Sequence, residues 1–364
     1  MRGLYIHIPF CKKICTYCDF TKRVPKNKLM IDEYLTHLKE ELLTYKKYFD
    51  SVETIYIGGG TPTLLDNDEL IYLFEMLKDF KNIKEFSIEI NPETLTLDKV
   101  KILKKYGVNR CSIGVESFDD KILKTLGRTH SKEDVIKAIN MLKNEGITNI
   151  NIDLIFATPG SNLSSIKNDL KEFYKLDIKH LSYYSLILEE NTILNHLYKN
   201  KKIELIDNEL EAKMYEYIIS DLEKNGFKQY EISNFSKEGY ESIHNKIYWE
   251  NKEYIGVGLG ASGYLDRRRY TNNTVLNTYY KKCIKTSEFI DKNTQFCEEM
   301  ILGLRLNKGI NIDFVKKKYE KDILNDYKDI EKYINSGHLI IENGYLHLTK
   351  KGLLIANDIF VIFI

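Results

Sequence analysis

The sequence predicts an α/β protein with a partial (β/α)6 barrel, followed by a small helical, winged-helix-like C-terminal domain. In the first half, short runs of β-branched and aromatic residues alternate with longer amphipathic stretches. Near the C-terminal end, Leu339–Ile341 and Tyr345–Leu348 flank Asn343-Gly344, a dipeptide typical of a tight hairpin turn. Repeated strand–helix units favour parallel strands, either in an open doubly wound sheet or in a barrel. Six units fall short of the eight of a full barrel.

Six strands and six helices make up the predicted barrel. Glycines at 107 and 146 close two of the helices, as C-terminal caps do. In either architecture, ligands bind beyond the carboxyl ends of the strands, and the motifs described below follow strands. The strands are expected at Leu4–Ile8, Val52–Ile57, Glu85–Ile90, Arg110–Val115, Asn149–Ile155 and His180–Ile187. The helices are expected at Ile31–Phe49, Asp66–Phe80, Thr96–Tyr106, Lys132–Glu145, Leu163–Lys175 and Asn208–Asn225.

The sequence pattern changes near Gln229, which divides the chain into three expected segments. Residues 1–228 form the barrel, residues 229–288 form a connecting region rich in aromatic residues and glycine, and residues 289–364 form the C-terminal domain. The connecting region predicts loops and short strands lying against the barrel. The C-terminal segment predicts helices that end in the hairpin.

Composition gives no support for a nucleic-acid partner and leaves membrane association possible but not shown by the sequence. Lys and Arg (54) nearly balance Asp and Glu (53), and the net charge of +1 gives no argument for a nucleic-acid partner or an anionic membrane. No apolar run approaches the roughly 20 residues needed to span a bilayer, and the strand-like Tyr5–Phe10 leaves no room for a signal peptide. Three of the six cysteines lie within eight positions, which favours a metal site and a reducing, cytoplasmic location over a disulfide framework.

The clustered cysteines, Cys11, Cys15 and Cys18, have the spacing Cys-x3-Cys-x2-Cys directly after the first predicted strand. Thiolates are the soft ligands that iron–sulfur clusters require, and three of them can hold three irons and leave a fourth iron open. Structural zinc normally has four closed ligands in paired knuckles, and no second knuckle is found here. The alternatives are a zinc site completed by His7 or Asp19, or unrelated thiols. We therefore expect a 4Fe–4S cluster.

The segments Tyr5–Cys11 and Cys18–Phe20 resemble the opening of the radical SAM superfamily. More narrowly, they resemble the branch that contains the oxygen-independent coproporphyrinogen III dehydrogenases and the HemW-type haem chaperones. The resemblance implies that the amino and carboxylate groups of S-adenosylmethionine (SAM) chelate the open iron. It also implies that one electron, supplied to the cluster by a donor, cleaves the sulfonium bond of SAM.

Further motifs of the resemblance follow the later strands in order. Taken alone, the glycines of Gly58–Pro62 indicate a turn, Glu89 a solvated edge residue, Arg128 a surface salt bridge, and Asp153 an ordinary strand-end carboxylate. Glu116 departs from the family pattern, which has Gln there; an ionised Glu only accepts hydrogen bonds, so a ribose hydroxyl could still donate to it. By resemblance, the SAM contacts are Tyr5, Tyr17, Gly59, Gly60, Thr61, Glu89, Glu116, Arg128 and Asp153.

Two features separate this chain from the dehydrogenases of the branch. Those enzymes carry a further cysteine two residues beyond the third ligand, where this chain has Phe20, and an N-terminal extension before the cluster motif. Both departures point away from SAM-dependent decarboxylation of coproporphyrinogen III, which remains the alternative function. A radical SAM enzyme acting on another substrate is a third interpretation. The radical SAM scaffold leaves open whether the chain is an enzyme.

A third feature matches the His-Asn-x-x-Tyr-Trp motif of HemW-type chaperones, where it is linked to haem binding. Imidazole is a good axial ligand for haem iron, and Tyr and Trp offer flat faces to a porphyrin. The alternative is that these side chains pack the junction between the barrel and the C-terminal domain. The resemblance implies haem as a cofactor and a haem-acceptor protein as partner, with the haem site formed by His244, Asn245, Tyr248 and Trp249.

Overall fold

Six parallel strands form the centre of one twelve-stranded sheet in the computed structural model, which describes residues 2–364. They lie side by side in chain order, and each pairs in parallel with the next. The predicted α/β class and the six-unit partial barrel are confirmed. The strands are β1 (Arg2–Ile8), β2 (Val52–Gly59), β3 (Glu85–Ile90), β4 (Arg110–Glu116), β5 (Asn149–Phe156) and β6 (His180–Ser185).

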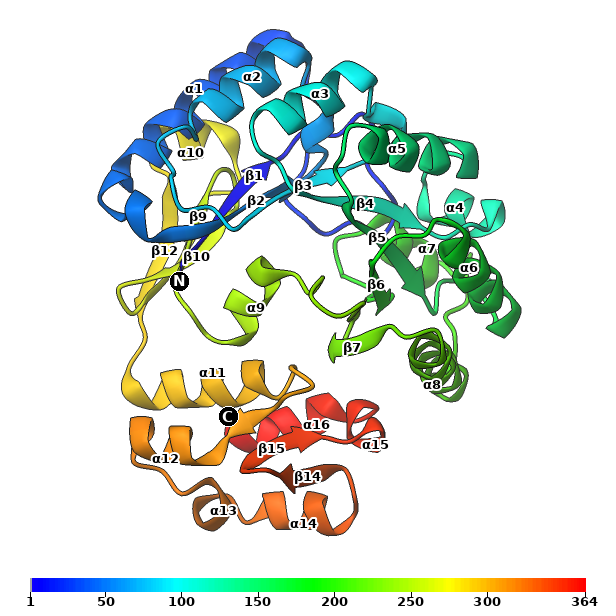
Figure 1. Cartoon of the computed structure of the whole chain (residues 1–364), viewed down its shortest axis with the longest axis vertical. Coiled ribbons are helices and arrows are strands. Elements are labelled where there is room, and N and C mark those ends of the chain that lie inside the picture. The colour runs from blue at the N-terminus through cyan, green and yellow to red at the C-terminus, as the bar shows by residue number, and fades with distance from the viewer. Residues whose placement is uncertain (1) are drawn as a thin grey trace.

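Helices cover the outer face of the curved sheet (Figure 1). Most begin with a side-chain cap; Asp66 and Ser131, for example, each form a capping box. The expected helix after Ser131 agrees with the structure to one residue, whereas the first expected helix divides after Thr44 into an α-helix and a 3-10 turn. The helices are α1 (Lys28–Thr44), α2 (Asn67–Glu75), α3 (Leu97–Lys105), α4 (Asp120–Leu126), α5 (Lys132–Asn144), α6 (Leu163–Lys175), α7 (Ile193–Lys199) and α8 (Asn208–Lys224).

The strands have an apolar outer face and a polar inner face. In β4, Cys111, Ile113 and Val115 are fully buried among apolar side chains, whereas Arg110 and Ser112 occupy the alternate positions. This alternation follows from the two-residue repeat of a strand. The main hydrophobic core therefore lies between the sheet and its helices, and the inner face is left for polar chemistry.

The connecting region joins the sheet instead of lying against it. On one side, β9 pairs in parallel with β1, and three antiparallel strands continue the sheet; on the other side, two antiparallel strands extend it beyond β6. Such pairing satisfies the backbone N–H and C=O groups that edge strands would leave open. The added strands are β7 (Lys228–Glu231), β8 (Asn234–Ser236), β9 (Tyr254–Val257), β10 (Ser262–Leu265), β11 (Arg268–Asn272) and β12 (Ile284–Phe289), and the helix α10 (Leu276–Lys281) lies before β12.

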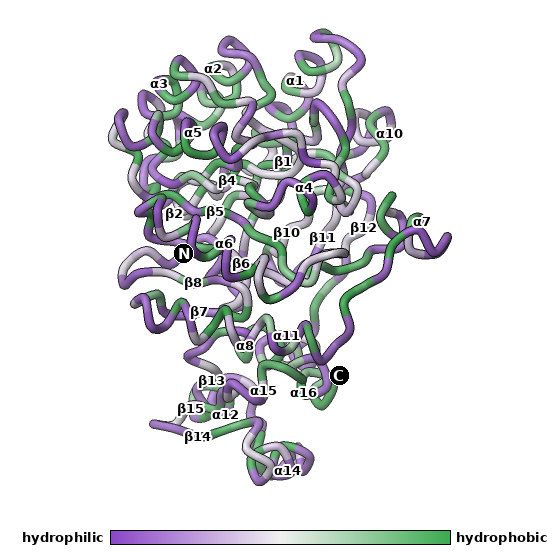
Figure 2. Tube along the Cα trace, turned by 90° about the vertical axis from the view of Figure 1, so that its right-hand side faces the viewer, coloured by the Kyte–Doolittle hydropathy of each residue, from purple (hydrophilic) through white to green (hydrophobic). Residues whose placement is uncertain are grey.

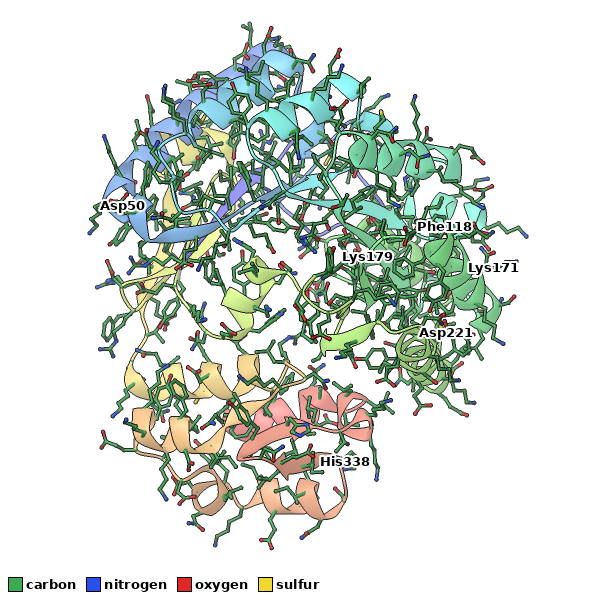
Figure 3. All side chains as sticks on the ribbon, viewed as in Figure 1. Asp50, Phe118, Lys171, Lys179, Asp221 and His338 are labelled. Atoms are coloured by element: carbon green, nitrogen blue, oxygen red, sulfur yellow. The ribbon has the colours of Figure 1, made fainter. Side chains whose placement is uncertain are left out.

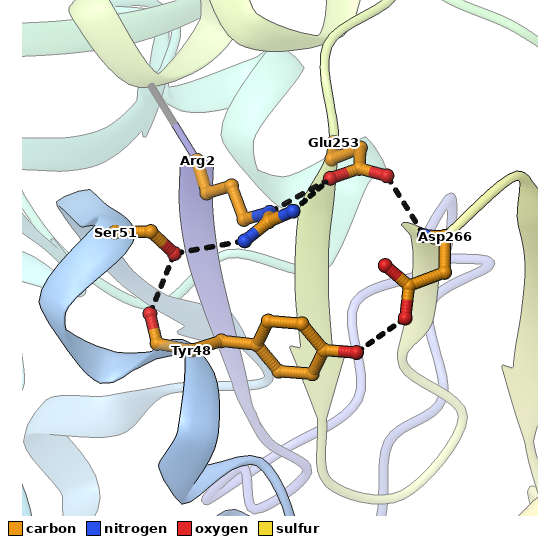
Figure 4. A network of polar contacts seen from close by, with 5 residues as sticks. All are labelled: Arg2, Tyr48, Ser51, Glu253 and Asp266. Carbon is orange, nitrogen blue, oxygen red and sulfur yellow. Dashed lines mark hydrogen bonds and ion pairs between the residues drawn. The ribbon is translucent and has the colours of Figure 1, made fainter.

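A polar network fixes β1 to the added strands (Figure 4). Arg2 donates two hydrogen bonds to Glu253, at 2.7 and 2.5 Å, and a third to the hydroxyl of Ser51 at 3.0 Å. Tyr48 donates to Asp266, whose backbone N–H donates to Glu253. The network joins segments more than 200 residues apart in sequence, at the end of the barrel away from the cysteine loop.

The helix α9 (Ile243–Trp249) lies between the sheet and the C-terminal part of the chain (Figure 1). That part has its own hydrophobic core, built around Phe296, Met300 and Ile359, and a small sheet that includes the predicted hairpin. Figure 2 shows this part below the barrel, with hydrophobic segments of its own. Its elements are α11 (Lys292–Gly303), β13 (Ile310–Asn311), α12 (Ile312–Tyr319), α13 (Ile323–Asp326), α14 (Asp329–Asn335), β14 (Leu339–Glu342), β15 (Tyr345–Leu348), α15 (Lys350–Leu353) and α16 (Ala356–Phe360).

Within residues 2–364, no helix combines the length and the apolar character that crossing a membrane requires.

Candidate functional site

A cavity of about 250 Å³ lies at the carboxyl ends of β1 to β6, beside the cysteine loop. All three clustered cysteines, which follow β1, line this cavity. Residues in or after the five strands β2 to β6 line it as well. Of the nine residues predicted to contact SAM, eight line the same cavity: Tyr17, Gly59, Gly60, Thr61, Glu89, Glu116, Arg128 and Asp153. Tyr5 lies outside this lining.

The cysteine loop is held by backbone hydrogen bonds to three parts of the chain. Within the loop, Cys11 N–H donates to the carbonyl of Arg23 at 2.9 Å. Thr16 donates its N–H to the Leu126 carbonyl at the end of α4 and accepts from Leu194 N–H in α7. These bonds fix the loop across the carboxyl ends of the strands.

The environment of the three thiols disfavours their ionised form. Burial raises the pKa of Cys11 to about 11 and also raises the pKa values of Cys15 and Cys18, although the Arg128 charge opposes the rise at Cys15. Across residues 2–364, no three His, Cys, Asp or Glu side chains converge closely enough to hold one metal ion. The three thiols share one cavity as separate groups, and each of them can ligate a different iron of a cluster.

The glycines after β2 bring the backbone close to the cysteine loop. A Cβ on Gly60 would lie 2.9 Å from Cys11 Sγ and 2.8 Å from the Phe10 carbonyl oxygen. Gly59 has a φ of 115°, and a Cβ there would lie 2.6 Å from the ring of His7. Only glycine fits at these two positions, so the cavity keeps open space beside the thiols.

Two buried glutamates carry raised pKa values. Burial, followed by the nearby charge of Asp153, raises the pKa of Glu89 to about 7. Glu89 accepts hydrogen bonds from Tyr56 Oη and Gly59 N–H, both at 2.9 Å. Burial also raises the pKa of Glu116 to about 7, against the opposing charge of Arg128. Both carboxyl groups can accept hydrogen bonds from donor groups of a ligand when they are ionised.

Arg128 supplies a guanidinium to the cavity, which Lys13 and Lys22 also line. It donates to the Gly114 carbonyl at 2.5 Å and to Asn91 Oδ1 at 3.3 Å, and its Nη1 lies 3.8 Å from Cys15 Sγ. Its Nε is buried and has no hydrogen-bond partner within residues 2–364. Asp153, which pairs with Gly114 across β4 and β5, accepts from Ser112 Oγ at 3.0 Å. The cavity thus presents thiols, a guanidinium and carboxylates together, and this set fits both the cluster and a ligand with amino, carboxylate and hydroxyl groups.

Sequence reasoning missed several lining residues. They stand at inward positions of strands, or directly after a strand, where ordinary alternation conceals them. For Asn91 and Gly114, the two-residue spacing from Glu89 and from Glu116 is the signal that could have found them. The missed residues include Tyr56, Asn91, Ser112, Gly114 and Tyr184.

A second cavity, of about 500 Å³, lies between α9, the added strands and α11. Tyr5, Tyr248, Trp249 and Tyr254 give it aromatic walls, together with Ile301 and Leu302. Its polar lining consists of Asn251, Lys252, Ser262, Arg269 and Glu298. The rings of Tyr5 and Tyr56 stack at a centroid distance of 6.2 Å and separate this cavity from the first.

The four residues of the predicted haem motif divide into two pairs. Tyr248 and Trp249 line the second cavity. His244 is 1% exposed; its Nδ1 lies 2.8 Å from Thr54 Oγ1 and its Nε2 2.7 Å from Tyr248 Oη. Asn245 is half-buried and lies outside the lining. Burial lowers the pKa of His244 to about 3, so the ring is neutral and both of its nitrogens are engaged.

A buried chain of hydrogen bonds joins α9 to the first cavity. Ser242, which caps α9, donates its N–H to Tyr230 Oη, and Tyr230 donates to His180 Nε2 at 2.9 Å. The Asn151 side-chain NH2 group donates to Asp153 at 2.8 Å, so the Asn151 Oδ1 is the atom that faces His180. This oxygen accepts a hydrogen bond from the other ring nitrogen of His180 at 2.6 Å. Burial lowers the pKa of His180, which keeps the ring neutral. Each donor in the chain therefore meets an acceptor.

Comparison with known proteins identifies the family. The Radical SAM superfamily model matches residues 5–173, and the HemN C-terminal domain model matches residues 290–355. The haem chaperone HemW of Lactococcus lactis is 38% identical over 98% of this chain and 95% of its own length. The chain belongs to the HemW family. HemW of Bacillus subtilis is also 38% identical, over 100% of this chain and 99% of its own length.

The fold of this HemW-family chain also occurs in a solved structure. Coproporphyrinogen III oxidase (HemN) from Escherichia coli, described as a radical SAM enzyme, has a TM-score of 0.86 over 99% of this chain and 89% of its own. The sequence identity is 22%, so this likeness concerns the fold alone. As a radical SAM protein of the HemW family, the chain binds a 4Fe–4S cluster and SAM, for which the first cavity holds the fitting groups.

Proposed function

We propose that this chain is a haem chaperone that binds haem in the second cavity and passes it to an acceptor protein. The observation that carries the proposal is that Tyr248 and Trp249, the aromatic pair of the predicted motif, line a cavity of about 500 Å³. This volume lies within the range of about 300–1,000 Å³ that is usual for small-molecule sites. The HemW name of the relatives supports the same assignment.

The lining of the second cavity matches the chemistry of haem. Aromatic and aliphatic side chains suit the flat porphyrin, and the cations of Lys252 and Arg269 suit its carboxylates. Both cations are paired in the structure, with Glu250 and Glu298 respectively, so they would exchange a protein carboxylate for a haem carboxylate.

The proposal includes His244 as a candidate ligand of the haem iron. His244 can reach iron only if it leaves Thr54 or Tyr248. His244 holds the hydroxyl of Tyr248, whose side chain lines the cavity. The predicted direct haem contacts of His244 and Asn245 stay predictions.

The proposed setting is the reducing cytoplasm, which the six free cysteines support. The acceptor is proposed as a haem-binding protein.

We assign SAM-contact roles to the eight residues that line the first cavity, because the resemblance predicts these roles and the eight residues share one lining. Tyr5 keeps a proposed indirect role, because its hydroxyl lies 2.9 Å from His7 Nδ1, beside Gly59.

Haem titration followed by absorption spectroscopy tests the proposal. Trp249→Ala should weaken haem binding about tenfold or more, since one buried aromatic wall is lost, and should leave iron–sulfur content unchanged. His244→Ala and Tyr248→Phe separate the possible iron ligands: the variant that lacks the ligand shifts the Soret band, and the other variant alters affinity alone. Tyr106→Phe, on the outer helices, is the control. Absence of stoichiometric haem binding by the wild-type chain, or turnover of coproporphyrinogen III, would overturn the assignment.

A further inference from the structure

We infer that SAM binding in the first cavity strengthens haem binding in the second cavity, and that Tyr56 transmits this effect. Tyr56 is a positioning residue: its hydroxyl bonds to Glu89 in the first cavity, and its ring packs against His244 of α9, the helix that supplies two walls of the second cavity. The inference rests on the proposed haem site, and one of its tests needs no haem.

Tyr56 and Glu89 line the first cavity together. Tyr56 Oη donates to Glu89 Oε1, and Gly59 N–H donates to Glu89 Oε2, both at 2.9 Å. Each carboxylate oxygen can accept one further hydrogen bond. A ligand group that donates to Glu89 favours the ionised carboxylate. The bond from Tyr56 is then charge-assisted and stronger, so it restricts the motion of the Tyr56 ring.

The same ring of Tyr56 packs against α9. It stacks on the ring of His244 at a centroid distance of 5.2 Å, with the two planes 30° apart. His244 Nε2 lies 2.7 Å from Tyr248 Oη, and the Tyr248 ring packs edge-on against Tyr254 at 4.7 Å. Tyr248 and Tyr254 line the second cavity. Continuous contacts therefore lead from a carboxyl group of the first cavity to the wall of the second.

The position of α9 depends on the inner face of the sheet. The helix has seven residues, too few to be stable alone. Its first N–H groups donate to Glu85 of β3, and the buried hydrogen-bond chain through His180 joins its N-terminal cap to Asp153 in the lining of the first cavity. Restricting the Tyr56 ring therefore also restricts α9. Haem that binds afterwards loses less conformational entropy, which raises its affinity.

Haem titrations with and without saturating SAM measure the coupling. The full chain carries its reconstituted cluster, and no reductant is added, so that SAM stays intact. SAM should raise haem affinity about fivefold or more, and haem should raise SAM affinity by the same factor, because coupling between two binding sites is reciprocal. Equal haem affinities in the two titrations, or weaker haem binding in the presence of SAM, would overturn the inference.

Tyr56→Phe removes the hydroxyl and keeps the ring. The coupling factor should fall to about one, because Glu89 no longer holds the ring; both titrations of the variant use saturating or no SAM, so its SAM affinity does not enter the factor. The matched control is Tyr184→Phe. Tyr184 lines the same cavity and donates to Glu116 at 3.4 Å, but it packs against the apolar cluster around Ile122. The control should keep the factor, whereas a full factor in Tyr56→Phe, or its loss in the control alone, would refute the role of Tyr56.

Amide hydrogen exchange tests the link between SAM and α9 without haem and without a variant. In the haem-free wild type with its cluster, SAM should slow exchange in Ile243–Trp249 about fivefold or more. The internal reference is α8, whose Asp221 lies at the outer edge of the molecule, away from α9 (Figure 3); its exchange should not change. Unchanged exchange in α9, or equal slowing in α8, would contradict the inference. If α9 is protected by SAM and haem does not bind, the haem assignment fails and the link between SAM and α9 stands.

Discussion

At the scale of single residues, the ionisation of Glu89 links the first cavity to pH. The pKa of Glu89 is raised to about 7 by burial and by the charge of Asp153. Below that pH the carboxyl group is protonated, and above it the group is ionised and accepts hydrogen bonds from the donors of a ligand. We therefore expect SAM affinity to rise as the pH passes through about 7 and to level off above it. Calorimetry between about pH 5.5 and 8.5 measures this step.

Two glutamine variants distinguish which of the two glutamates causes the pH dependence of SAM affinity. Glu89→Gln should lower SAM affinity about tenfold at pH about 8 and flatten the pH step, because a charge-assisted hydrogen bond is lost. Glu116→Gln, which restores the residue usual in the family, should keep the step. A step that survives in Glu89→Gln and disappears in Glu116→Gln would assign the titration to Glu116.

At the scale of elements, Glu85 holds α9 in place. Glu85 is 3% exposed and accepts hydrogen bonds from Ser242 Oγ, Ile243 N–H and His244 N–H at 3.1, 2.7 and 3.0 Å. A seven-residue helix is not stable alone, and a carboxylate at its N-terminus satisfies the N–H groups that lack helical partners. Glu85→Ala should lower the free energy of unfolding by about 3 kcal/mol, since it leaves buried donors unpaired beside Arg110. Chemical denaturation measures this loss.

The same variant should weaken haem binding more than SAM binding, because α9 supplies Tyr248 and Trp249 to the second cavity. Asp207→Ala removes an exposed cap from α8 and should cost about 1 kcal/mol with no effect on either ligand. Equal losses for the two variants would show that Glu85 is an ordinary cap.

At the scale of the whole molecule, the C-terminal part closes the second cavity. Arg269 of β11 donates two hydrogen bonds to Glu298 of α11, at 2.5 and 2.8 Å, and the Arg305 guanidinium lies 4.6 Å from the centre of the Trp249 ring. Glu298→Ala should raise amide hydrogen exchange in α11, with SAM affinity unchanged. Glu320→Ala removes an exposed ion pair inside the C-terminal part and should change neither. Unchanged exchange in α11 would contradict this closing role.

The sequence was sufficient where chemistry and local pattern coincide. The cysteines and the glycines follow strands, the acids lie in the carboxyl-terminal halves of strands, and the parallel arrangement brings them to one edge. Strand positions such as Glu85–Ile90 agree with the structure because inward and outward residues alternate strictly there.

The remaining features depend on contacts between distant segments. No local pattern shows that Thr54 and Tyr248 occupy both nitrogens of His244, or that Tyr230 completes a chain from His180 to α9. Tyr5 precedes the cysteines in sequence, yet its ring faces the second cavity, because β1 has that cavity beside it and the cysteine loop beyond its end. The incorporation of β9 into the sheet was hidden for the same reason.

Trp249 gives this molecule an internal optical reporter. It is the only tryptophan of the 364 residues, and it lies in the wall of the second cavity beneath Arg305. Tryptophan emission from the intact chain therefore comes from one known place, with no engineered label and no background from other indoles. Occupation of the cavity by a strongly absorbing pigment would dim that emission through energy transfer, whereas a colourless ligand behind the Tyr5–Tyr56 partition would leave it bright. In the chain that already holds its cluster, a single emission trace can thus follow the filling and emptying of the second cavity in real time, while SAM binds in the first cavity.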